Sequence, residues 1–296
     1  MTQRVYIHRE SLSKDFRDAQ ILQGKIHSVF HRVINLSFII AGETRIITLI
    51  GEKIPLLPDS ITVPDEIFSI LGNQHKCGII KYKDTICFGE ILLLLCHPAK
   101  AALHLPDKVY RGSQELWFCN IKKLNQFKAP EGKQTDIVRL PPDFRRAAVS
   151  FADGYIMEKK KQIEEAYIAL VGAGRGLTPS CDDAMLGIMA GACTWLSVKD
   201  GEKGKDRFLE LSCGMGKDLL QKKRTTDISC KYLKCACRGR FSILLCNMLE
   251  WAAFAGREDN LPDELVMSIS DIGHTSGMDM LFGLKIFCEE AVRCIG

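Results

Sequence analysis

The chain has 296 residues, 46% of them hydrophobic and 26% charged, so it can bury the core of one large domain or two modest ones. Its formal net charge of +4 is too small for the concentrated basic surface that is typical of nucleic-acid-binding proteins. No apolar run approaches the ~18 residues that a membrane-spanning helix needs, and the longest candidate, residues 91–96, has the length of a buried strand.

The 13 cysteines favour a reduced compartment over a disulfide framework, because disulfide scaffolds are usually short, secreted chains. Residues 1–4 contain no apolar signal region, so we expect a cytoplasmic protein. Cys230, Cys235 and Cys237 lack the CxxC spacing of a zinc site and are interpreted as structural thiols.

The N-terminal part of the chain is predicted to be rich in strands. The β-branched runs expected to form strands cover residues 29–40, 44–50, 78–83, 85–89 and 91–96. The first two runs are joined by a turn that contains Gly42, which predicts a hairpin. Pro64, followed by two acidic residues, indicates the start of a short helix over residues 67–71.

From Pro142 onward the hydrophobic period changes from 2 to 3.6, which predicts helices. The predicted helices cover residues 144–170 with a bend near Gly154, 180–198, 207–222, 226–237, 242–254, 262–271 and 276–294. The polar, proline-bearing segment 130–142 separates the two patterns. The predicted fold class is therefore α+β, with a β-rich N-terminal domain at residues 1–135 and an α-helical bundle domain at residues 136–296.

The first of three polar helix starts lies at residues 172–183. Gly172, Gly174 and Gly176 permit backbone angles that other residues resist, and they let a ligand approach the main chain. Thr178 and Ser180 add hydroxyl groups, and the helix that follows is expected to point free N–H groups back at this loop. Such a loop can bind an anion, although no lysine follows the last glycine as it does in a Walker loop.

Asp182 and Asp183 fall in the first turn of that helix. Neighbouring helical side chains diverge by about 100°, so one aspartate could cap the helix while the other points into a site and acts on a substrate or a metal. A helix N-terminus could also lower the pKa of the Cys181 thiol, although a nucleophilic role for it is not favoured.

The second helix start lies at residues 225–229, directly after the basic residues 222–224, which could guide an anion. Thr225 or Thr226 is a natural N-cap, and Ser229 adds a further hydroxyl about one turn later.

The third helix start lies at residues 273–279. Thr275 or Ser276 can cap it, and Asp279 occupies the place of the acid in a capping box. His274 precedes the cap in a glycine-flanked loop, where it could titrate near neutrality and exchange a proton. The three starts are predicted to form one shared pocket for small anions; the alternative is three well-capped helices with no ligand.

These segments resemble the AllH family, the third subunit of oxamate carbamoyltransferase. The resemblance rests on Gly174-Arg175-Gly176-Leu177-Thr178-Pro179-Ser180-Cys181-Asp182-Asp183, on Thr225-Thr226 with Ser229 and Tyr232-Leu233, and on Gly273-His274-Thr275-Ser276-Gly277-Met278-Asp279 with Gly283-Leu284. A weaker similarity lies at Arg32-Val33-Ile34-Asn35-Leu36, so the resemblance touches both predicted domains.

The resemblance implies carbamoyl transfer, in which oxalurate and phosphate give oxamate and carbamoyl phosphate in a complex with AllF-like and AllG-like subunits. For this reaction we expect His274 to exchange the proton of the transferred nitrogen or of phosphate, and Asp182 or Asp183 to orient it, so these three are the predicted catalytic residues. The residues expected to bind substrate are Gly174, Arg175, Gly176, Thr178, Ser180, Thr225, Thr226, Ser229, Thr275, Ser276 and Asp279. No dedicated metal ligand is assigned, although the aspartates could hold Mg²⁺ beside a phosphate. A non-catalytic assembly subunit and a metal-dependent hydrolase of a small anion remain the alternatives.

Overall fold

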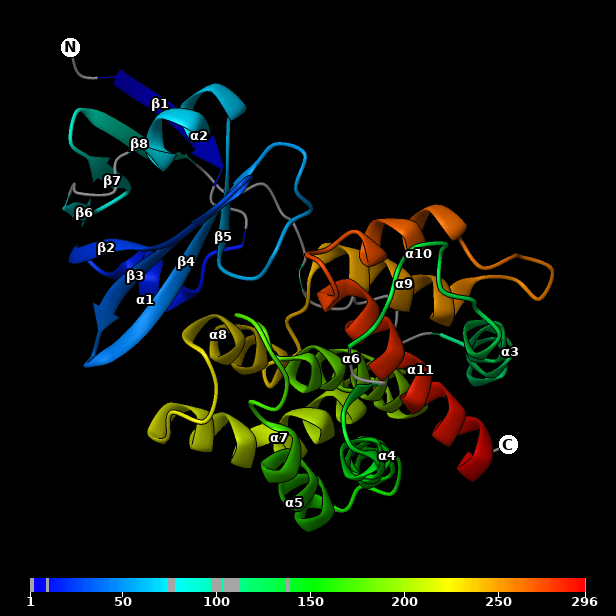
Figure 1. The fold of residues 1–296 in the computed structure, drawn as a ribbon. Helices are drawn as coiled ribbons and strands as arrows, with labels where there is room; N and C mark the ends of the chain where they lie inside the picture. The colour runs from blue at the N-terminus through cyan, green and yellow to red at the C-terminus, as the bar shows by residue number, and fades with distance from the viewer. Residues whose placement is uncertain are drawn as a thin grey trace. The chain divides into compact units, whose positions relative to one another are not determined.

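The computed structural model describes residues 3–8, 11–73, 78–96, 103, 112–136 and 139–295. The chain forms two compact units, Met1–Leu103 and His104–Gly296 (Figure 1). The first contains a sheet with two helices and the second is helical throughout its described elements, which confirms the predicted α+β class. The predicted domain boundary at residues 135–136 lies further along the chain than this division, beyond helix α3 (Gln114–Asn125) of the second unit.

The first unit is built on one eight-stranded sheet, in the order β1-β8-β7-β6-β2-β3-β4-β5. Its strands are β1 (Gln3–His8), β2 (Ile21–Phe30), β3 (Val33–Ile40), β4 (Glu43–Gly51), β5 (Ser60–Val63), β6 (Ile79–Tyr82), β7 (Thr85–Phe88) and β8 (Ile91–Cys96). The end strands β1 and β5 pair in parallel with β8 and β4, and the other neighbours are antiparallel.

Both predicted strand pairs are present. Ala41 and Gly42 have positive φ angles of 51° and 81° in the turn between β3 and β4, as the glycine in that turn predicted. The expected single strand over residues 29–40 was wrong, because the chain turns at residues 31–32 and the run is divided between β2 and β3. A continuous β-branched run does not reveal such a turn.

Two short helices, α1 (Lys14–Asp18) and α2 (Asp65–Gly72), contribute Phe16, Phe68 and Leu71 to the core of this unit. Helix α2 begins after Pro64 and buries the face that the sequence predicted. Asn35, in the segment with the weaker family similarity, is buried, and its side chain links β2, β3 and β4 through Ser28 and Thr48 at 3.0 and 2.8 Å.

The second unit is a cluster of nine helices in its described part. They are α3 (Gln114–Asn125), α4 (Pro142–Ile156), α5 (Lys160–Leu170), α6 (Ser180–Asp200), α7 (Glu202–Gln221), α8 (Asp227–Ala236), α9 (Ile243–Phe254), α10 (Asp263–Ser270) and α11 (Ser276–Ile295). The predicted helix over residues 144–170 is two helices, because Glu158 takes a positive φ of 54° and ends α4. Gly154 lies against Ile163 of α5 rather than at a bend.

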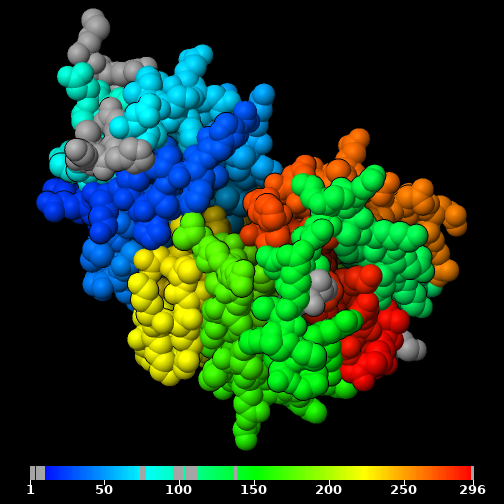
Figure 2. Space-filling model, in the orientation of Figure 1, coloured from blue at the N-terminus to red at the C-terminus, as the bar shows by residue number. Residues whose placement is uncertain are grey.

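Helix α6 is the central helix of this unit. It is buried from Ser180 to Val198, on all sides, and contacts α11, α7, α4, α8 and α9. On the face that the space-filling view shows, side chains fill the gaps between the ribbons of the outer helices of this unit (Figures 1 and 2). Helices α6 and α11 approach very closely, since a Cβ added at Gly187 would lie 2.0 Å from the Met280 carbonyl oxygen.

Within the described residues, no helix has the length and apolar character to cross a membrane. The cysteines whose side chains are described are all free thiols.

Candidate functional site

The glycine loop before α6 folds onto the second motif. Gly172, Gly174 and Gly176 all have positive φ, at 77°, 117° and 92°. A Cβ at Gly172 would lie 2.3 Å from the Arg224 carbonyl oxygen, whereas one at Gly176 would meet nothing within 4 Å. The close backbone approach that the glycines were predicted to allow is thus made at Gly172 by the chain itself.

Asp182 joins the first motif to the second. Its Oδ1 accepts a 2.7 Å hydrogen bond from the Gly172 N–H, and its Oδ2 accepts a hydrogen bond from the Thr225 hydroxyl. Burial raises the pKa of this carboxyl, and hydrogen bonds from Gly172, Ser229 and Thr225 partly offset that rise. Both oxygens of Asp182 are therefore used to hold the loop and the start of α8 together.

Asp183 faces the third motif instead. Its side chain is 3% exposed, and its Oδ2 makes no hydrogen bond within the described part of the chain. Burial raises the pKa of this carboxyl well above its usual range, hydrogen bonds with Ser276 and Thr178 oppose that rise, and the charges of Asp279 and Asp182 add to it. As predicted, the two neighbouring aspartates point to different surroundings.

Hydroxyl groups complete the connections among the helix starts. Thr178 and Ser276 lie 2.8 Å apart, between their Oγ1 and Oγ atoms, and join the first motif to the third. Thr226 donates to the Leu177 carbonyl oxygen while its Oγ1 accepts from the Ser229 N–H at 3.1 Å, which is the predicted N-cap of α8. The three motifs therefore meet at one place in the second unit.

Asp279 links this place to the polar segment 130–142, where the sequence predicted the boundary between the two domains. Its Oδ1 accepts from the Thr135 hydroxyl and, at 3.0 Å, from the Asp136 N–H. Thr135 and Asp136 were not predicted to belong to the site. Only the polar composition of their segment sets them apart, and nothing in that composition shows that they contact α11.

Three N–H groups at the start of α6 already donate to carbonyl oxygens, so the expectation of free N–H groups does not hold for these three. The Cys181 N–H donates to the Ala173 carbonyl oxygen at 3.0 Å, and the N–H groups of Asp182 and Asp183 donate to the Pro179 carbonyl oxygen at 2.9 and 3.1 Å. The tight glycine loop brings its own carbonyl groups to the helix start, where an anion was expected. The Cys181 thiol is also buried, and burial raises its pKa to about 12 rather than lowering it.

Positive charge near the motifs is either exposed or already paired. Arg175 and His274 are exposed and, within the described residues, make no hydrogen bond or ion pair. Lys222 and Arg224 both pair with Asp218, and the 3.8 Å pair of Lys223 is with an acid of α8. The basic residues 222–224 thus neutralise neighbouring acids, which leaves Arg175 and His274 as the unpaired basic groups of the motifs.

The aspartates do not form a ready metal site. Among the described residues, the one group of three metal-ligating side chains with ligand atoms within 4.8 Å of one another is Asp153, Glu290 and Cys294, between α4 and α11. Arg293 already binds one member of this group, because its Nη2 donates to both carboxylate oxygens of Asp153 at 3.1 Å. The arrangement of the motif aspartates therefore does not fit a preformed Mg²⁺ site.

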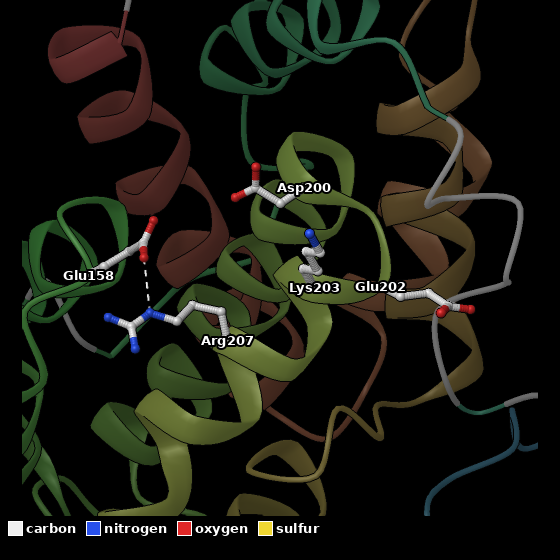
Figure 3. Close-up of a pocket in the computed structure, with 5 residues that line it drawn as sticks. All are labelled: Glu158, Asp200, Glu202, Lys203 and Arg207. Atoms are coloured by element: carbon white, nitrogen blue, oxygen red, sulfur yellow. Dashed lines mark hydrogen bonds and ion pairs between the residues drawn. The ribbon is translucent and has the colours of Figure 1, made fainter.

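A surface depression lies elsewhere, at the junction of α6 and α7 (Figure 3). Glu158 and Arg207 point toward each other there, with 2.9 Å between Oε2 and Nε, while Glu202 points away from them. Lys199 also pairs with Glu158 at 2.7 Å, and hydrogen bonding from Lys199 lowers the pKa of that carboxyl despite partial burial. These ion pairs join the α4–α5 turn to α6 and α7, and no residue of the three motifs lines this depression.

Two family models match the chain. The model of the oxamate carbamoyltransferase subunit AllH matches residues 170–288, which include all three helix starts, and the model of the AllH family N-terminal domain matches residues 3–101. No solved structure matches the chain. Because the two matches cover most of both units, the chain belongs to the AllH family of oxamate carbamoyltransferase subunits.

Proposed function

We propose that this chain acts in a carbamoyltransferase complex that converts oxalurate and phosphate to oxamate and carbamoyl phosphate, with AllF-like and AllG-like partner subunits, and that the joined helix starts bind its substrates. The family name supports a subunit of oxamate carbamoyltransferase. The observation that carries the proposal is the meeting of three motifs through the bonds Asp182–Thr225 and Thr178–Ser276. Helix caps alone would not require contacts between separate starts.

The proposed reaction moves one carbamoyl group. A phosphate oxygen attacks the terminal ureido carbon of oxalurate, and the bond from that carbon to the inner nitrogen breaks. The nitrogen takes the proton that phosphate gives up, so the products are oxamate and carbamoyl phosphate. Negative charge grows on the carbonyl oxygen during the attack, and hydroxyl groups held in place, such as those of Thr178 and Ser276, can stabilise it.

Two exposed basic side chains of the motifs can bind the anionic substrates or transfer a proton. Arg175 can bind a carboxylate or a phosphate through two hydrogen bonds. It lies close to the helix start, because a Cβ added at Gly174, which has a positive φ, would lie only 2.5 Å from the Ser180 nitrogen. His274 lies two residues before Ser276 and is the group that we expect to pass the proton from phosphate to nitrogen. Ser180 and Thr275 flank the same helix starts, and Asp182 acts through the loop that it holds.

The test is to mix the purified chain with its two expected partner subunits and to assay carbamoyl phosphate formed from oxalurate and phosphate. We expect turnover that depends on this chain and falls by roughly 10²- to 10⁴-fold in His274→Ala, the size of a lost acid–base catalyst. His31→Ala, in the exposed turn between β2 and β3, is the matched control and should keep the wild-type rate.

An unchanged rate in a folded His274→Ala complex would remove the proton-transfer role and favour the alternative of a non-catalytic assembly subunit. Turnover by the two partner subunits alone would contradict the proposal as a whole.

A further inference from the structure

The three buried carboxylates at the joined helix starts are not equally available to a ligand. Both oxygens of Asp182 accept hydrogen bonds from the chain, and Oδ1 of Asp279 accepts two more. Asp183 differs from Asp182, because it is only 3% exposed and its Oδ2 makes no hydrogen bond within the described residues. A buried carboxylate oxygen without a donor is costly, and binding sites are where such groups are retained.

The surroundings of Asp183 decide which chemical group can reach that oxygen. The charged groups that act on it are two more carboxylates, Asp182 and Asp279, and its hydrogen-bonding neighbours are the hydroxyls of Thr178 and Ser276. A phosphate or carboxylate group would be repelled by these acids. The group that fits is a hydrogen-bond donor that carries no negative charge of its own.

Both proposed substrates contain such a group. Oxamate ends in a primary amide, and oxalurate has a terminal –NH₂ and an inner N–H. A carboxylate accepts N–H donors at either oxygen, while a hydroxyl such as that of Thr178 or Ser276 can donate to the neighbouring amide carbonyl. One amide group can thus satisfy Oδ2 of Asp183 and a hydroxyl at the same time.

Building on the proposed function, we propose that Asp183 is the residue that recognises the amide nitrogen of the substrate and makes the site select amides. The anionic end of the substrate then points away from the aspartates, toward the exposed Arg175 and His274. The phosphate-binding and amide-binding ends of the site are therefore different groups of residues.

Pyruvate provides the test, because it has the charge and shape of oxamate with a methyl group in place of the amide nitrogen. Binding of oxamate and of pyruvate to the reconstituted complex is measured by calorimetry. We expect the wild type to prefer oxamate by roughly 10- to 100-fold, the range of a hydrogen bond to a charged group. Asp183→Leu, of similar shape without an acceptor, should bind both compounds equally, and Asp183→Asn should keep an intermediate preference.

Asp200→Asn, at the opposite end of α6 and exposed, is the control and should keep the wild-type preference. Equal binding of oxamate and pyruvate by the wild type would overturn the inference, and a metal ion at Asp183 would give that result, because both compounds chelate through a carbonyl and a carboxylate. An unchanged preference in a folded Asp183→Leu complex would overturn it too; if that variant does not fold, the same result in Asp183→Asn decides. A complex that turns over oxalurate without the preference disproves this inference alone, whereas one that neither binds oxamate nor turns over oxalurate disproves the proposed function as well.

Discussion

Asp182 and Asp183 are adjacent in the sequence and equally acidic, yet the structure gives them different environments. The helix places their side chains about 100° apart, so one meets the glycine loop and the other meets the start of α11. Asp182 receives hydrogen bonds from an N–H and from hydroxyl donors, which partly offset the rise in its pKa that burial causes. Asp183 keeps one oxygen without a donor, in the neighbourhood of two other acids. The chain tolerates this cost in stability at Asp183, which is the pattern expected of a binding group.

The cost should be visible as a pH dependence of stability. Burial raises the pKa of Asp183 in the folded chain above its unfolded value of about 3.9. The folded state therefore binds the proton more tightly, and the stability that this proton gives is fully present below pH ~3.9 and is lost as the pH rises toward the folded pKa. Asp183→Asn cannot lose a proton, so it should gain stability over the wild type between pH 4 and pH 8, by up to about 1.4 kcal/mol for each pH unit.

Urea unfolding at both pH values measures this difference. Asp200→Asn should stay within about 0.5 kcal/mol of the wild type at both, as surface substitutions usually do. If Asp183→Asn were instead less stable at pH 8 by the same amount as at pH 4, the carboxyl of Asp183 would be a structural group rather than a strained one.

At the scale of elements, the helices were easier to predict than the strands. Helices α6 to α11 begin or end within a few residues of the prediction, except for the earlier start of α7, because caps such as Thr226 and Ser242 and the 3.6-residue period are local signals. Strands β1 and β5 and helices α1 and α3 were not predicted. Strand β1 is held by a parallel pairing with β8, and such distant pairing leaves no local pattern to read.

The candidate site, too, could be predicted where the signals are local and could not where contacts join distant residues. The three helix starts and the divergence of Asp182 and Asp183 follow from capping rules and helix geometry. The occupied N–H groups of α6 could not be foreseen, because they depend on the path of the glycine loop before the helix. The bond from Thr135 to Asp279 joins residues that are far apart in sequence, and neither carries a pattern that identifies the other.

The crossing of α6 and α11 sets the distance between the first and third motifs. A Cβ at Gly283 would lie 2.0 Å from the Ala184 carbonyl oxygen, so Gly283→Ala must push the helices apart. Overpacking of this kind costs about 1–3 kcal/mol, more than the ~1 kcal/mol by which alanine favours a helix over glycine. We expect a net loss of unfolding free energy and weaker substrate binding, measured by urea unfolding and calorimetry.

Gly216→Ala in α7 is the matched control. The nearest atom to its added Cβ would be 3.7 Å away, so helix propensity should dominate and the variant should be as stable as the wild type or more stable. Equal stabilisation by both substitutions would show that the α6–α11 contact is not closely packed.

At the scale of the whole molecule, the chain has two separate hydrophobic cores. One is formed by residues from Leu12 to Leu95 around the sheet, and the other by residues from Trp117 to Ala291 around α6. All three helix starts, together with Thr135 and Asp136, belong to the second unit. The residues that position the candidate site thus all belong to the second unit, which has its own hydrophobic core.

The second unit should therefore fold without the first. A domain of this size buries roughly 70% of the surface that its unfolded chain exposes, which is sufficient for independent stability. We expect a fragment of residues 104–296 to be helical by circular dichroism and to unfold in one cooperative transition. The Gly172 amide, which donates to the buried Asp182, reports on the site itself, and its hydrogen exchange should be as slow in the fragment as in the full chain. Fast exchange at Gly172 in an otherwise folded fragment would mean that the glycine loop depends on the first unit. A non-cooperative unfolding transition would mean that the packing of the helices depends on the first unit.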